Sequence, residues 1–245
     1  MKKTDSIAFV FDIDDTLYDQ LAPFQWALEK NFPQLDIPAK PLYMASRKFS
    51  DEVFQLSESG QMSMEDMHIY RIQKAFATFG QEITQEEPLC FQKDYAAQQQ
   101  KITLLPEMRE SLVLCASKGI PLGIISNGPA AHQWRKVAQL GVEQWIPPEH
   151  IILSGEFGLA KPDSRIFRWA EEKMQIQKNF AYYIGDSFEN DVVGAKKAGW
   201  QAIWYNRRGH LPPKGSIQPD FQIDETHPAS SVLQEIITLQ VETEK

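Results

Sequence analysis

Two aspartates directly after a short apolar run have the type and spacing for chemistry. Asp12 and Asp14 follow the apolar residues 7–11. Strand side chains repeat every two residues, so the two carboxylates point the same way if the chain stays extended. Two acids facing one pocket suit a division of labour, in which one attacks as a nucleophile and the other holds or passes a proton. The alternative is a surface turn, which explains one aspartate and Thr16 more easily than two acids facing the same way.

The element that must position these acids is the apolar run itself. Residues 7–11 are rich in β-branched and aromatic types, which is typical of a strand buried on both faces. Carboxylates at the end of such a strand are costly without a positive partner. In open α/β sheets, ligands bind at the carboxyl ends of the strands. The sequence therefore predicts a ligand site there, with its charge balanced by a cation and most readily by a metal ion.

From about residue 104, apolar runs alternate with helical patterns, which predicts parallel βαβ units in an α/β fold. We expect a Rossmann-like parallel sheet with helices on both faces, formed by residues 1–19 and 101–245. The expected strands after the first are residues 120–126, 151–154, 180–184 and 201–205, with a further edge strand at 221–223.

The stretch between the first and second strands is helical in pattern throughout. Residues 20–100 carry four helical patterns and no strand pattern, which predicts an all-helical domain inserted after the first strand. Ser63 with Asp66 three residues later is a variant of the capping box and predicts a helix start.

Polar residues follow the other expected strands too. Ser126 and Asn127 end the second strand, Lys161 follows the third, and Asp186 and Asp191 follow the fourth. Each of them could instead belong to a turn, a solvated loop or a helix cap. Because the carboxyl ends of parallel strands share one edge, we expect these groups to converge there.

These segments resemble the four motifs of the haloacid dehalogenase-like (HAD) hydrolase superfamily. Asp12 to Thr16 matches the first motif, Asp-x-Asp-x-Thr, Ser126 the second, Lys161 the third, and residues 185–191 the fourth. A helical cap inserted directly after the first motif marks the subgroup that includes phosphoglycolate phosphatases, β-phosphoglucomutases and nucleotidases. The resemblance implies an α/β core and a helical cap domain at residues 20–100.

The resemblance also implies a mechanism. Asp12 would attack phosphorus and form an aspartyl-phosphate, and Asp14 would serve as the acid and base. Mg²⁺ would be held by the carboxylates of Asp12 and Asp186 and by the backbone carbonyl of Asp14. Lys161 would offset the negative charge and help to hold the phosphate.

Further residues take supporting roles by the same resemblance. Ser126 and the backbone near Asn127 would bind phosphoryl oxygens. Asp191 would orient Lys161 or a metal-bound water, and Thr16 would steady the loop that carries the second acid. In the cap, Arg71 lies among apolar neighbours and is the leading candidate for a substrate contact. The alternative for Arg71 is a solvated helix face or a salt bridge.

The expected function is an Mg²⁺-dependent phosphatase of small phosphomonoesters. By resemblance, dehalogenases lack an acid at the position of Asp14, because a halide needs no proton. The segment 204–207 resembles nucleotidase-like members, so nucleoside monophosphates or sugar phosphates are candidate substrates. Two alternatives stay open: a phosphomutase on the same core, and a catalytically silent binding protein on this scaffold.

The composition of the chain limits the classes of partner that it is expected to bind. The 245 residues carry a formal net charge of −8, which argues against nucleic-acid polymers and anionic membranes. No apolar run approaches the roughly 20 residues of a membrane span, and no leader pattern precedes the first strand. Cys90 and Cys115 are expected as buried free thiols, with a disulfide as the alternative. We expect a cytoplasmic monomer or homodimer whose partner is a small phosphorylated metabolite.

Overall fold

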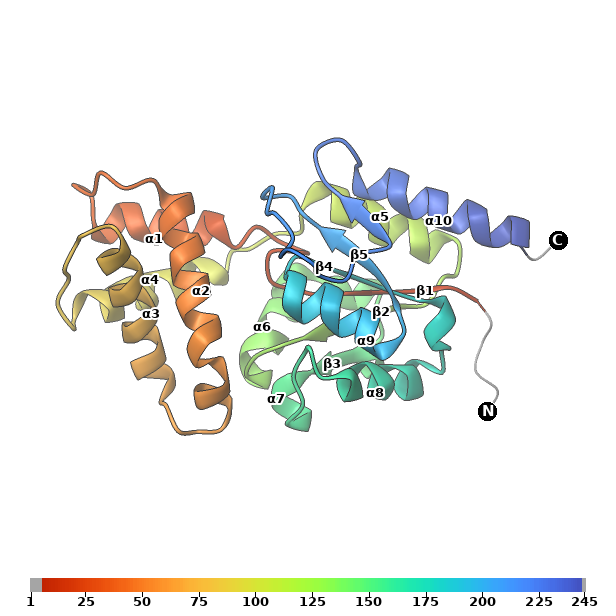
Figure 1. The fold of residues 1–245 in the computed structure, drawn as a ribbon, viewed down its shortest axis with the longest axis horizontal. Coiled ribbons are helices and arrows are strands. Elements are labelled where there is room, and N and C mark those ends of the chain that lie inside the picture. The colour runs from red at the N-terminus through yellow and green to blue at the C-terminus, as the bar shows by residue number, and fades with distance from the viewer. Residues whose placement is uncertain (1–5, 244–245) are drawn as a thin grey trace. The chain divides into compact units, whose positions relative to one another are not determined.

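The structure is a computed structural model that describes residues 6–243. Within this range the chain forms two compact units. Asp19–Ile102 make a helical unit, and the segments on either side of it make an α/β unit. Figure 1 shows the helical unit in red-orange to yellow and the α/β unit mainly in green to blue.

The α/β unit contains a six-stranded sheet in the order β3-β2-β1-β4-β5-β6. All neighbouring strands pair in parallel, which confirms the expected α/β fold and its edge strand. The strands are β1 (Ala8–Phe11), β2 (Leu122–Ser126), β3 (Ile151–Leu153), β4 (Ala181–Gly185), β5 (Gln201–Tyr205) and β6 (Phe221–Ile223).

Helices cover both faces of this sheet. They are α5 (Pro106–Ser117), α6 (Ala130–Leu140), α7 (Ser154–Phe157), α8 (Ser164–Met174), α9 (Gly194–Ala198) and α10 (Ala229–Thr243). Figure 1 shows α5 and α10 together along one side of the sheet and α8 and α9 along the other. On the α8 side, Phe167, Ala170 and Trp200 pack with Val10 and Ile125 in one buried cluster. Burial of these side chains holds the strands in place.

The strand order explains why a site forms at β1. The chain runs outward from β1 through β2 and β3 on one side, and through β4, β5 and β6 on the other. The carboxyl ends of β1 and β4 therefore flank the point where the order reverses, which is where open α/β sheets bind ligands. Phe11 pairs with Ile184, and the Asp12 amide donates to the Ile184 carbonyl at 2.9 Å.

The helical unit consists of four helices around its own core. They are α1 (Leu21–Asn31), α2 (Ala39–Glu58), α3 (Met64–Thr78) and α4 (Glu87–Gln99). Phe24, Phe76 and Phe91 are buried there, and the ring centroids of Phe24 and Phe91 lie 4.9 Å apart. The Asp66 amide donates to Ser63 Oγ at 3.0 Å, so the Ser63 hydroxyl caps α3 as the sequence predicts.

Three local features differ from the expectation. The helix expected at residues 190–198 begins with a π-helix, Phe188–Val193, and only then continues as α9. The short helix α7 and the 3₁₀ turns Val142–Gln144, Pro148–His150 and Lys178–Phe180 had no periodic signal, since three or four residues are too short to show a period. Cys90 is exposed although Cys115 is buried, and both thiols are free.

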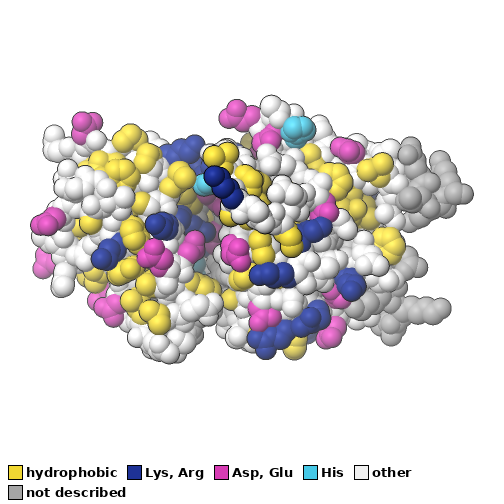
Figure 2. Space-filling model, in the orientation of Figure 1, with side chains coloured by type: hydrophobic (Ala, Val, Ile, Leu, Met, Phe, Trp, Pro, Cys, Tyr) yellow, Lys and Arg dark blue, Asp and Glu magenta, His cyan; other side chains and the backbone are white. Residues whose placement is uncertain are grey.

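Within residues 6–243, no helix is both long and apolar enough to span a bilayer. On the face shown in Figure 2, acidic and basic side chains are interspersed, and neither sign covers a continuous area.

Candidate active site

Asp12 lies at the first position after β1 and is buried, with 6% of its surface exposed. Its Oδ1 accepts a hydrogen bond from Lys161 Nζ at 2.7 Å. Burial raises the pKa of the Asp12 carboxyl to about 6, and nearby Asp191 and Asp14 add to that rise, while Lys161 opposes it. The Asp12 carboxylate shares its cationic partner, Lys161, with Asp191. A further cation nearby would favour the ionised form of Asp12.

Lys161 is the positive centre of this cluster. Its Nζ donates to Asp12 Oδ1, to Asp191 Oδ1 at 2.7 Å and to the Tyr183 hydroxyl at 2.8 Å. Burial alone would lower the pKa of Lys161, but the two carboxylates raise it above its ordinary value. The Asn127 side chain fixes the Lys161 backbone, since its Oδ1 accepts from the Lys161 amide at 2.8 Å and its Nδ2 donates to the Lys161 carbonyl at 2.9 Å.

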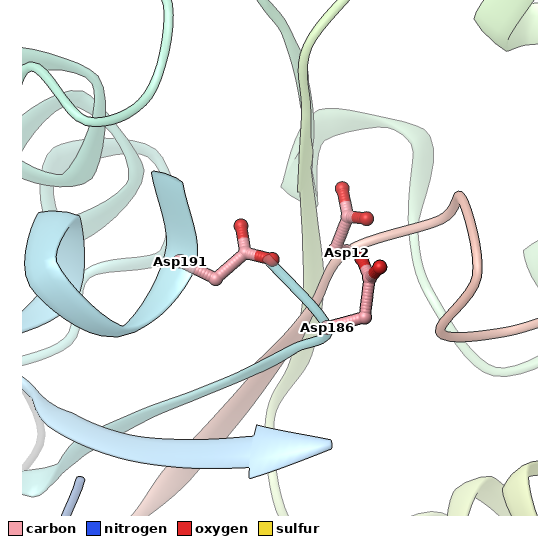
Figure 3. A group of neighbouring side chains, drawn as sticks. All are labelled: Asp12, Asp186 and Asp191. Atoms are coloured by element: carbon pink, nitrogen blue, oxygen red, sulfur yellow. The ribbon is translucent and has the colours of Figure 1, made fainter. Parts of the chain in front are cut away.

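Three carboxylates converge where β1 and β4 end. One oxygen from each of Asp12, Asp186 and Asp191 lies within 4.8 Å of the other two. Figure 3 shows Asp12 and Asp186 close together, with Asp191 reaching toward them from the π-helix. Asp191 Oδ2 also accepts from the Ser187 amide at 2.9 Å. A Cβ on Gly185 would lie 2.3 Å from this oxygen, so the close approach of Asp191 requires glycine at position 185.

The Asp14 carboxylate lies against α6. Its Oδ1 accepts from the Tyr18 hydroxyl at 2.5 Å and from Lys136 Nζ at 2.6 Å. Its Oδ2 accepts from Gln133 Nε2 at 3.0 Å and from the same ammonium at 2.7 Å. Asp14 thus has a lysine of its own, while remaining close enough to Asp12 to raise the pKa of that residue.

The sequence reasoning missed these partners of Asp14. Gln133 and Lys136 are three residues apart on α6, and both are buried on the same side as Val137 and Leu140. Burying a glutamine and a lysine costs free energy unless both have polar partners. Their helical spacing within an apolar stripe therefore indicates that they contact a buried polar or charged group.

Two predicted hydroxyls lie buried in the same unit. Neither Ser126 Oγ, at the end of β2, nor Thr16 Oγ1 has a hydrogen-bond partner among the described residues. Buried polar atoms in native proteins are almost always satisfied, so an unsatisfied hydroxyl at a strand end is compatible with a ligand contact. Asp15, next to Thr16, has a left-handed backbone with φ of 58° and pairs with Arg208.

Arg71 belongs to the helical unit, on α3. Its guanidinium donates to Gln92 Oε1 at 2.5 Å and lies 5.8 Å from the ring centroid of Tyr95. Arg71 Nε is buried without a hydrogen-bond partner among the described residues. Burial lowers the pKa of Arg71, and the nearby Arg47 lowers it further.

The charges and donor atoms of the α/β site fit a divalent cation. Lys136 pairs with Asp14, and Lys161 pairs with Asp12 and Asp191. Together with Asp186 of the acidic cluster, these six groups carry a net charge of −2 when all are ionised. All of the clustered acidic ligands are oxygen atoms, the donor type that Mg²⁺ prefers.

Comparison with known proteins agrees with this geometry. The family model of the haloacid dehalogenase-like hydrolases matches residues 8–199. A glyceraldehyde 3-phosphate phosphatase of Methanothermobacter thermautotrophicus is 32% identical over 85% of this chain and 92% of its own. The pyrimidine 5'-nucleotidase PynA of Streptococcus pneumoniae is 27% identical over 87% and 89%. The magnesium-bound HAD-hydrolase YfnB from Bacillus subtilis shares the fold, with a TM-score of 0.70 and 20% identity over 95% and 99%.

The parallel sheet with an acidic cluster at its switch point defines an α/β protein whose polar site lies at the carboxyl ends of the strands. The chain belongs to the haloacid dehalogenase-like hydrolase family, because the family model covers most of its length. The enzyme class that this membership and the phosphatase relatives indicate is phosphoric monoester hydrolase.

Proposed function

We propose that this protein is an Mg²⁺-dependent phosphatase that hydrolyses small phosphomonoesters through an aspartyl-phosphate on Asp12. The observation that carries the proposal is the buried Asp12 carboxylate, bonded to Lys161 within a cluster of three acids. A carboxylate is a competent nucleophile toward phosphorus when the charge around it is neutralised.

In the first step, an Asp12 oxygen attacks phosphorus and the bond from phosphorus to the ester oxygen breaks. Asp14 gives a proton to the departing oxygen, so the alcohol leaves neutral. Lys161 fixes one Asp12 oxygen in place, and its charge offsets the charge that gathers on the phosphoryl group. The unsatisfied Ser126 hydroxyl and the backbone at Asn127 are suited to donate to phosphoryl oxygens.

In the second step, Asp14 takes a proton from a water molecule that attacks the same phosphorus. The bond between phosphorus and the Asp12 oxygen breaks, which releases inorganic phosphate and restores the Asp12 carboxylate and the protonated Asp14. Mg²⁺, held by the carboxylates of Asp12 and Asp186 with the backbone carbonyl of Asp14, would neutralise the repulsion between nucleophile and phosphoryl group. Asp191 keeps Lys161 oriented, and Thr16 steadies the loop after Asp14.

The phosphatase proposal is tested by phosphate release from a panel of esters. The panel contains glyceraldehyde 3-phosphate, phosphoserine, sugar phosphates and nucleoside 5'-monophosphates. Wild type with Mg²⁺ should release phosphate, whereas Asp12→Asn, or wild type with a chelator, should not. Turnover that survives both treatments would refute the mechanism. Product analysis on a sugar phosphate separates free phosphate from an isomerised sugar, which a mutase would form.

Substrate choice is assigned to the helical unit, with Arg71 as its leading contact. The support is a guanidinium in partly buried surroundings with one N–H group unsatisfied, which suits an anionic or polar group of a substrate. Arg71→Met should raise KM for the preferred ester about tenfold, the loss of about one charge-assisted hydrogen bond, with kcat largely kept. Lys74→Met, on the exposed side of the same helix, is the matched control. An unchanged KM in Arg71→Met would remove Arg71 from the binding surface.

A further inference from the structure

Lys136 is a buried lysine that the mechanism above does not use. It lies in the middle of α6, and only 4% of its side chain is exposed. Its Nζ contacts both oxygens of Asp14, at 2.6 and 2.7 Å, and lies 5.9 Å from the centroid of the Tyr18 ring. A buried ammonium is costly, so its placement against this particular carboxylate calls for a physical reason.

The surroundings of Asp14 are built to hold that carboxylate in one orientation. Tyr18 and Lys136 donate to Oδ1, and Gln133 and Lys136 donate to Oδ2, so both oxygens are fixed from the α6 side. Gln133 Nε2 also donates to the Asn127 carbonyl at 2.8 Å, which ties the network to the loop after β2.

Gly128 makes room for this arrangement. A Cβ at position 128 would lie 2.9 Å from Gln133 Nε2, and the backbone there has φ of 130°, which favours glycine. The loop after β2 and the α6 helix that follows it are therefore joined at Asp14 to the segment after β1, which is more than 100 residues away in the sequence.

We propose that Lys136 is a positioning residue for Asp14, and that it confines the carboxylate to the place from which it passes a proton to and from the reacting oxygens. This inference rests on the proposed role of Asp14 in phosphate ester hydrolysis. Because the ammonium contacts both oxygens, it keeps its bond to one of them while the other gives or takes the proton, and the carboxylate does not rotate. Proton transfer is fast only when the carboxyl oxygen lies within hydrogen-bond distance of the oxygen that gains or loses the proton.

The leaving group provides the readout. An alkyl oxygen must be protonated as it departs, whereas p-nitrophenolate leaves with little help from an acid. In Lys136→Met, kcat/KM for an alkyl phosphate should fall about 10- to 100-fold, part of the roughly 10²- to 10⁴-fold that general acid–base catalysis supplies. For p-nitrophenyl phosphate, kcat/KM should fall less than about threefold. Lys136→Arg, which keeps a cation with several donors, should recover part of the alkyl activity.

Arg135→Met is the matched control, because Arg135 is the exposed neighbour on α6 and its Nε donates to the Ala131 carbonyl of the same helix. It should leave both substrates unaffected. Equal losses for the two substrates in Lys136→Met would mean a merely structural role and would overturn the proposal, and so would undiminished alkyl activity.

A double-mutant cycle on the melting temperature tests this inference separately from the proposed function. The melting temperatures of wild type, Lys136→Met, Asp14→Asn and the double variant should be non-additive, since each single change leaves a buried partner behind. Additive shifts would show that the pair does not form and would overturn the inference even in an active phosphatase. A wild type without turnover on any ester would instead refute the proposed function and the catalytic part of the inference, while non-additive melting would still establish the pair.

Discussion

At the scale of single residues, Lys161 decides the charge balance of the site. It is the shared donor to Asp12 and Asp191, and 3% of its side chain is exposed. Such a group contributes little net stability compared with apolar packing, but its removal leaves two buried carboxylates facing each other. The same lysine therefore affects both the stability of the folded state and the proposed chemistry.

Replacing Lys161 by methionine should accordingly destabilise the protein. Removing one partner of a buried ion pair costs about 3–5 kcal/mol, so the free energy of unfolding of Lys161→Met should fall by about that amount. Urea denaturation of the metal-free protein measures it. Lys118→Met removes an exposed lysine of the same unit and should change the value by no more than about 0.5 kcal/mol. Similar stability in the two variants would contradict the account.

The residues open to prediction were those at strand ends. Asp12 and Asp186 stand where an apolar run stops, and Lys161 follows β3 after the short helix α7, so their order along the chain indicates that they meet at one edge of the sheet. Lys136 sits within a helix, and only the helix axis and its rotation bring that residue to Asp14. The apolar stripe of α6 indicates that Lys136 is buried, but the carboxylate that it contacts is decided by tertiary packing, which the helical period does not specify.

At the scale of elements, most boundaries follow local chemistry. All six expected strands form, because apolar runs bounded by turns leave few alternatives. The π-helix after β4 was not predicted, since its sequence has an ordinary helical period. Its wider turn coincides with Asp191 bonding back to the Ser187 amide, so a site contact and an irregular helix occur together, as π-bulges often do.

The start of α3 offers an element-scale prediction. Ser63→Ala removes the acceptor of the Asp66 amide and should destabilise the first turn by about 0.5–2 kcal/mol. Hydrogen exchange at the Asp66 amide should therefore become faster. Ser59→Ala is the control, because the Ser59 hydroxyl donates to the Leu56 carbonyl and caps no amide that the structure shows. Unchanged exchange at Asp66 would rule out the cap as a determinant of this helix start.

At the scale of the whole molecule, the formal net charge is −8. Part of this negative charge is concentrated in the cluster of Asp12, Asp186 and Asp191. That cluster couples metal binding to folding, because an ion that binds the folded state and not the unfolded chain stabilises it. The stabilisation is about 2.7 kcal/mol when the free ion is 100 times its Kd.

Mg²⁺ should therefore raise the melting temperature of the wild type in a concentration-dependent way. Asp186→Asn should lose most of this rise, since it removes one carboxylate of the cluster. Asp36→Asn, which neutralises an exposed acid of the helical unit, should keep it. The melting temperature needs no substrate, so equal responses in the three proteins would refute the metal site independently of any activity.

The most direct test of the central claim is to find where the phosphoryl group is carried. Wild type mixed with a ³²P-labelled ester and Mg²⁺ is quenched in acid, and the labelled peptide is sequenced by mass spectrometry. The account predicts an acid-stable, base-labile phosphoryl group on Asp12, and no protein label in Asp12→Asn. Label on a different residue, or steady phosphate release by the Asp12→Asn variant, would contradict it.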